Sequence, residues 1–177
     1  DVFGLQSELS VTGRIRLEDG SLDTALEVDR LDGPGGQLSL TATYANANEQ
    51  LELDLSLSEP ENGIVANLLN IEGRPDIALG LSGAGPIEDL VVALTLDADS
   101  QRVLTGSGFL NQRPEGLAMT ADLEGPIADI LPAAYRDFFG TNSALSIDAL
   151  MRDGGGIELS RFNLSGGQLT IAADGET

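Results

Sequence analysis

Hydrophobic and polar residues alternate along most of the chain. The clearest run places leucine at Leu51, Leu53, Leu55 and Leu57, with acidic residues or serines between them. Successive side chains of a β-strand point to opposite faces, so this spacing predicts strands with one apolar and one polar face. The sequences EDGS, LDGPGG and NANEQ separate the early runs, and their composition is typical of turns. We therefore predict roughly ten to twelve strands joined as an antiparallel meander.

The apolar positions of these runs are expected to lie on one face and to line a groove. Residues 102–110 and 157–165 are expected to form strands with a weaker alternation. The predicted lining residues are Leu9, Val11, Ile15, Leu17, Leu22, Leu26, Val28, Leu38, Leu40, Leu51, Leu53, Leu55, Leu57, Ile77, Leu79, Leu81, Val92, Leu94, Leu96, Leu117, Met119, Leu145, Ile147, Leu169 and Ile171.

Two segments follow helical spacing instead. Residues 59–70 are predicted to form a short helix, with Ser58 and Glu61 as a capping box at its start. Residues 127–139 are predicted to form a second helix, which ends at Gly140. We expect the apolar side of the second helix to be buried against the sheet, either as ordinary core or as a plug in the groove.

Leucine dominates the inward positions, although β-branched and aromatic residues have the higher strand preference. Aromatic residues make up only 4% of the chain, which is little for a tightly packed core between two sheets. A leucine-lined wall offers contact area without polar groups, as an acyl chain requires. The alternative is that the leucines face one another in an ordinary core, and the pattern does not separate these two interpretations.

The amino-acid composition limits which catalytic groups, metal ligands and partners are possible. The formal net charge is −20, all nine basic residues are arginines, and the chain contains no Lys, His, Cys or Trp. The common general base, the reactive thiolate and the soft metal ligands are therefore missing. Such an acidic surface disfavours nucleic acids and anionic membrane faces as partners.

No motif predicts catalysis. The neighbouring acids Asp97 and Asp99, or Glu88 and Asp89, are typical of solvated strands and turns rather than of an acid–base pair. The glycine-rich stretch 153–156 is not a phosphate loop, because the GxxxxGK pattern is missing. The acidic composition would also suit a calcium-binding β-roll, but the nonapeptide repeat of that fold is missing from the sequence. We expect no enzyme activity, no catalytic residue, no cofactor and no metal.

The chain offers no uninterrupted apolar stretch of about 18 residues, so we expect it not to span a membrane. It begins without a signal-peptide pattern, and strand-like alternation runs from about Leu5 to about Ala173. We interpret residues 1–177 as one β-groove segment of a longer protein. Short internal similarities, GPIEDL with GPIADI and GGQLSLTA with GGQLTIAA, favour an elongated sheet.

The order of several segments resembles a known family. GPGGQLSLTATY is followed by LELDLSLSEPENGIVANLLNIEGRPDIALGLSGAGPIEDLVVALTLD, by LTGSGFL and by LPAAYRDFFGTNSALSIDALMRDGGGIELSRFNLSGG. Together these segments resemble the bacterial TamB family, the translocation and assembly module proteins of the AsmA-like superfamily, over most of the chain.

This resemblance implies an all-β fold with two short helices, in which an elongated, curled antiparallel sheet forms a taco-like hydrophobic groove. It also implies a periplasmic segment of an inner-membrane-anchored protein that supports outer-membrane biogenesis. Its expected partners are phospholipid or another hydrophobic ligand, such as the β-strands of client proteins, and an Omp85-type outer-membrane protein for the full-length protein. The alternative function is a structural β-solenoid or adhesin-like module with a dry, side-chain-filled core.

Overall fold

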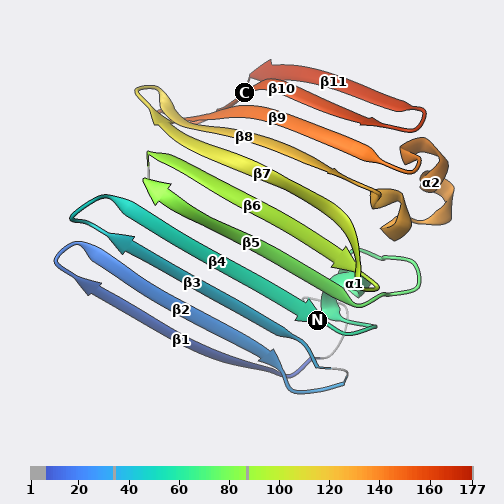
Figure 1. The fold of residues 1–177 in the computed structure, drawn as a ribbon, viewed down its shortest axis with the longest axis horizontal. Coiled ribbons are helices and arrows are strands. Elements are labelled where there is room, and N and C mark those ends of the chain that lie inside the picture. The colour runs from blue at the N-terminus through green and yellow to red at the C-terminus, as the bar shows by residue number, and fades with distance from the viewer. Residues whose placement is uncertain (1–6, 34, 87, 177) are drawn as a thin grey trace.

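The computed structural model describes residues 7–33, 35–86 and 88–176, so the predicted start of the pattern at Leu5 lies outside the described residues. Eleven antiparallel strands form one sheet, and each strand pairs with its neighbours in the chain (Figure 1). This confirms the predicted all-β meander. The strands are β1 (Leu9–Glu18), β2 (Ser21–Arg30), β3 (Gln37–Ala45), β4 (Gln50–Glu59), β5 (Ile77–Pro86), β6 (Asp89–Ala98), β7 (Gln101–Arg113), β8 (Gly116–Gly125), β9 (Ser143–Arg152), β10 (Ile157–Gly166) and β11 (Leu169–Glu176).

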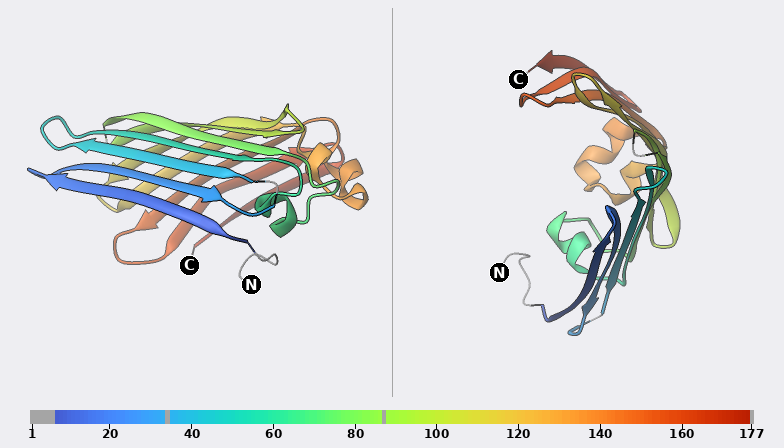
Figure 2. Two further views of the ribbon diagram at one scale, coloured as in Figure 1. Left: turned by 90° about the horizontal axis from the view of Figure 1, so that it is seen from below. Right: turned by 90° about the vertical axis from the view of Figure 1, so that its left-hand side faces the viewer.

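The sheet curves into an open trough with β1 and β11 at its two edges (Figure 2). The predicted turns join the early strands; in the first of them Asp19 and Gly20 have φ values of 48° and 79°. Positive φ at both central residues matches a two-residue hairpin turn, whose twist suits the flanking strands. Three short helical elements lie on the concave side near one end of the strands, namely α1 (Ile64–Leu68), η1 (Ile127–Ile130) and α2 (Ala133–Phe139).

The first helix is shorter than predicted. Glu59 is the last residue of β4, and α1 begins only at Ile64, so the predicted range 59–70 is wrong at both ends. The predicted capping box of Ser58 and Glu61 is also wrong. The carboxylate of Glu59 accepts hydrogen bonds from the backbone N–H groups of Ile64 (3.1 Å) and Val65 (2.8 Å) instead. A buried acid at the end of a strand therefore satisfies the first amides of the helix.

The second predicted helix, 127–139, is two elements. Proline at 132 restricts the preceding Leu131 to an extended conformation, and this residue has ψ 150°. The chain therefore forms the 3₁₀ turn η1, then a break, then α2. The end at Gly140 is confirmed, with φ 65° at that residue. The expected burial is confirmed for η1, whose Ile130 packs against buried residues, and is wrong for α2, since Tyr135 and Phe138 are 56% and 51% exposed.

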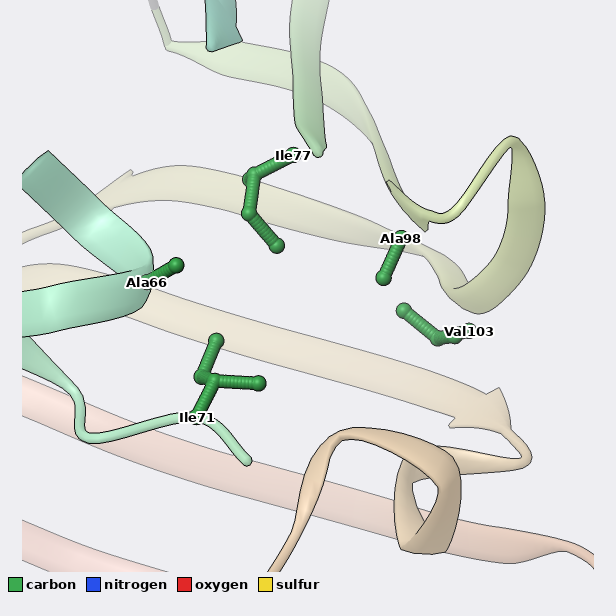
Figure 3. Packing of buried hydrophobic residues seen from close by; sticks show 5 residues of the cluster. All are labelled: Ala66, Ile71, Ile77, Ala98 and Val103. Atoms are coloured by element: carbon green, nitrogen blue, oxygen red, sulfur yellow. The ribbon is translucent and has the colours of Figure 1, made fainter. Parts of the chain in front are cut away.

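Close packing is concentrated where α1 meets the sheet. The helix α1, the loop after it and the adjoining strand ends form one buried cluster, called here the end core, of Ala66, Ile71, Ile77, Ala98 and Val103 (Figure 3). Ile77 and Val103 are 2% and 1% exposed. The end core therefore fills the concave side of the trough near α1.

The two strands with weak alternation contain register shifts. Pairing between β6 and β7 shifts between Leu96 and Asp97, and pairing of β10 with its neighbours shifts between Leu159 and Phe162. An extra residue in one strand reverses the parity of inward positions beyond it. The shift in β10 explains the less regular hydrophobic period in residues 157–165. In residues 102–110 the shift affects only the start of β7, and the inward positions Gly106 and Gly108 interrupt the period further.

Candidate functional site: the concave face of the sheet

The pairing register brings the predicted lining residues onto one face. Leu55 pairs with Leu40 of β3 and with Leu81 of β5, which in turn pairs with Leu94 of β6. Directly paired residues point to the same side of a sheet. The same argument, applied strand by strand from β1 to β11, places every predicted lining residue on this side. It is the concave side, because Ile77 belongs to the same row and is part of the end core, which includes Ala66 of α1.

Most of this apolar face has no second layer over it. At the β1 edge Val11, Ile15 and Leu17 are 64%, 77% and 74% exposed. In β4 the leucines are half-buried, shielded by their cross-strand neighbours. Among the predicted lining residues, all of which are described, Ile77 and Val92 are the buried ones. A contiguous, partly solvated leucine surface is uncommon in a monomeric soluble protein and is typical of an interaction site.

The apolar face has a hollow over its middle strands. A hollow of about 270 Å³, called here the central hollow, is bordered by Leu53 of β4, Leu94 of β6 and Leu123 of β8. Gly108 and Ala121 line it as well, and they pair with each other across β7 and β8. The small size of these two residues leaves the space that the surrounding leucines enclose. Sequence reasoning missed Gly108, because a glycine breaks the apolar alternation.

The opposite, convex face is mostly polar, although Val91 and Phe109, which pair with each other on it, are 54% and 36% exposed. Ion pairs cross between neighbouring strands on it, for example Arg14 with Asp23 (3.1 Å) and Arg161 with Asp148 (3.0 Å). These pairs are exposed and contribute little to stability. Their effect is to keep the outer face wetted while the apolar residues lie on the inner one.

A second cavity, of about 160 Å³, lies between the concave side of the first strands and α1; it is called here the end cavity. Its walls are mostly apolar and include Leu38, Leu57 and Ile64. Two charged residues also line it, Arg30 and Glu59. Sequence reasoning missed both, although Arg30 follows Leu26 and Val28 in inward parity, and Glu59 follows Leu55 and Leu57.

Arg30 forms a two-point ion pair with Asp32. Its Nε donates to Oδ1 (3.3 Å) and its Nη2 to Oδ2 (3.1 Å) of the aspartate, which also accepts from the backbone N–H of Glu8 (2.6 Å). The hydrogen bond from Arg30, followed by that from Glu8, lowers the pKa of Asp32. A lowered pKa means that this carboxylate stabilises the fold above its ordinary pKa, and that the contribution disappears as the pH falls through the lowered value.

In the described part of the chain, no three acidic residues lie close enough together to hold a metal ion. No helix within the described ranges has the length and apolar character needed to cross a membrane.

Comparison with known proteins finds no family model, no curated protein and no solved structure that matches this chain.

Proposed function

We propose that the concave face binds the acyl chains of phospholipids or a comparable hydrophobic ligand, and that the protein has no catalytic role. The observation that carries this proposal is the half-exposed leucine surface, deepened over β4–β8 by the central hollow. Acyl chains need apolar contact area and gain about 0.8 kcal/mol for each methylene removed from water. The half-exposed leucines do not favour the alternative, a structural module with a dry core.

The setting of this activity follows from the resemblance to the TamB family. We propose a periplasmic segment of an inner-membrane-anchored protein, in which the groove shields acyl chains, or apolar strands of client proteins, between the two membranes. An Omp85-type outer-membrane protein is the proposed partner of the full-length protein. The acidic, ion-paired convex face supports this proposal, since it keeps the outside of such a segment in water.

Replacing Leu55 with aspartate tests the proposal directly. Leu55 lies in the middle of the apolar face, and a carboxylate there would lose its hydration when an acyl chain covered it. We expect the affinity for a fluorescent hexadecanoyl probe to fall by about tenfold or more, corresponding to about 1.4 kcal/mol. Phospholipid in organic extracts of natively purified protein, measured by mass spectrometry, should fall in parallel.

The matched control is Ser56→Asp, which adds the same charge one residue along, on the exposed convex face. Its probe affinity should equal that of the unsubstituted protein. If extracts of the unsubstituted protein contain no phospholipid and both aspartate variants bind the probe equally, the acyl-binding proposal is wrong.

A second prediction concerns the central hollow. A Cβ added at Gly108 would meet only the backbone oxygen of Thr120, at 3.4 Å, so this site accepts a side chain. Gly108→Leu should fill the hollow and reduce hexadecanoyl binding severalfold, without lowering the melting temperature. The control is Gly13→Leu, because a Cβ at Gly13 is also free of close contacts (3.7 Å or more) and belongs to the concave side of β1, away from the hollow. Equal affinities of the two variants would show that the hollow does not hold the ligand.

A further inference from the structure

The guanidinium of Arg30 has one nitrogen without a hydrogen-bond partner. The Arg30 side chain is only 7% exposed, and its Nη1 atom is buried and makes no hydrogen bond. Nε and Nη2 are both committed to Asp32. Buried polar groups are nearly always paired, because an unpaired donor has lost its hydration without replacement. Arg30 lines the end cavity, so an unpaired donor in this side chain indicates a ligand with an atom that accepts a hydrogen bond.

The charges around this donor favour a neutral acceptor. Asp32 already balances the charge of Arg30, and Glu59, which is 6% exposed, adds a carboxylate to the same cavity. The whole chain carries a formal charge of −20. A carboxylate or phosphate would meet repulsion from these groups, whereas an ester carbonyl accepts a hydrogen bond and brings no net charge.

An apolar path leads from the end cavity to the central hollow. Leu57 lines the end cavity and Leu53 lines the hollow, with Leu55 between them on the same face of β4. Four residues of strand from Leu53 to Leu57 span about 13 Å. An acyl chain occupies a similar length, about 15 Å, in one leaflet of a bilayer. A chain anchored in the end cavity therefore reaches the hollow.

We infer that the end cavity is a binding site for the ester group of an acyl lipid, with Arg30 Nη1 as donor to the ester carbonyl and the alkyl chain lying along Leu57, Leu55 and Leu53. This inference rests on the proposed acyl-binding function and names the part of the ligand that the protein recognises. Apolar contact along β4 provides the affinity, and Arg30 distinguishes an ester from a plain hydrocarbon.

The test compares three probes with the same alkyl chain, namely methyl dodecanoate, dodecane and sodium dodecanoate. Each displaces an environment-sensitive apolar dye from the protein. We expect the unsubstituted protein to bind methyl dodecanoate about tenfold or more tightly than dodecane, since a hydrogen bond to a charged donor is worth at least that factor. Arg30→Met keeps most of the apolar stem and removes the donors, so it should lose this preference.

Arg102→Met is the matched control. Arg102 also pairs with an aspartate, Asp97, but it is 49% exposed and does not line the end cavity. This variant should keep the ester preference. If Arg30→Met keeps it as well, or if the unsubstituted protein prefers dodecanoate to the ester through Arg30, the ester site is wrong. If none of the three probes displaces the dye, both the ester site and the proposed acyl-binding function are wrong.

A measurement on the unsubstituted protein removes any dependence on the folding of Arg30→Met. In protein labelled with ¹⁵N-arginine, the side-chain resonances of Arg30 should shift on addition of methyl dodecanoate and stay in place with dodecane. Resonances of Arg102 should not respond to either probe. An Arg30 signal that is insensitive to the ester, while the dye is displaced, would overturn the inference and leave the acyl-binding function standing.

Discussion

Replacing Ile77 with alanine is expected to lower the free energy of unfolding by about 2–5 kcal/mol. Ile77 is 2% exposed and lies in the end core, between the loop after α1 and the adjoining strands. Removing its outer carbons leaves a cavity that the packed neighbours fill only in part. Urea denaturation followed by circular dichroism measures the loss.

The control for this prediction is Ile15→Ala, which removes the same atoms from a side chain that is 77% exposed at the β1 edge. We expect this change to cost about 0.5 kcal/mol or less, as is usual for surface substitutions. Similar losses for the two variants would contradict the view that stable packing is concentrated in the end core.

Replacing Glu59 with alanine is expected to cost about 1–3 kcal/mol, because the backbone amides of Ile64 and Val65 lose their acceptor. The same change should raise the rate of amide hydrogen exchange at these two residues, since the start of α1 is no longer held to the end of β4. Thermal unfolding and exchange measured by NMR together test both parts.

Glu61→Ala separates this prediction from the capping box that the sequence indicates. Glu61 is exposed and Glu59 is buried. We expect the Glu61 variant to unfold at the temperature of the unsubstituted protein. A larger loss for Glu61→Ala than for Glu59→Ala would restore the capping box as the correct interpretation.

The strands and their inward faces could be predicted because the apolar period is regular. In β4 the inward Leu57 pairs with a leucine on each side, Leu38 of β3 and Leu79 of β5, and Leu55 likewise has a leucine partner on each side. A shift of the strand pairing by one residue would move this whole set of leucines to the polar face. Alternation in such strands therefore determines both the fold and the side of the sheet that becomes the candidate site.

The helical segments were harder to predict because local spacing does not show what a helix packs against. Tyr135 and Phe138 have the spacing of a buried helix face, yet the described residues do not cover these two side chains of α2 and both are exposed. Its attachment depends on a contact that is distant in sequence: Glu72 accepts a hydrogen bond from Arg136 (3.2 Å) and another from the backbone N–H of Ala133 (3.0 Å). No periodicity in either segment indicates this pairing.

The two charged residues of the end cavity could have been predicted from the sequence pattern. Arg30 and Glu59 are the charged members of otherwise uncharged inward rows, and both stand at the end of their strands nearest α1. Two charges at matching inward positions predict a polar site in an apolar surface. What the sequence does not show is that Nη1 of Arg30 stays without a partner, because that depends on the position of Asp32 in the following turn.

Each strand pairs only with its neighbours in the chain, and this allows the number of strands to change. No strand within the described ranges is inserted between two others that are joined by a hairpin. Interactions then propagate along one dimension, from each strand to the next, as they do in repeat proteins. Two adjacent strands can be deleted or duplicated while the other strands keep their partners, so the width of the concave apolar surface is adjustable in units of one hairpin while the end core and Arg30 stay unchanged.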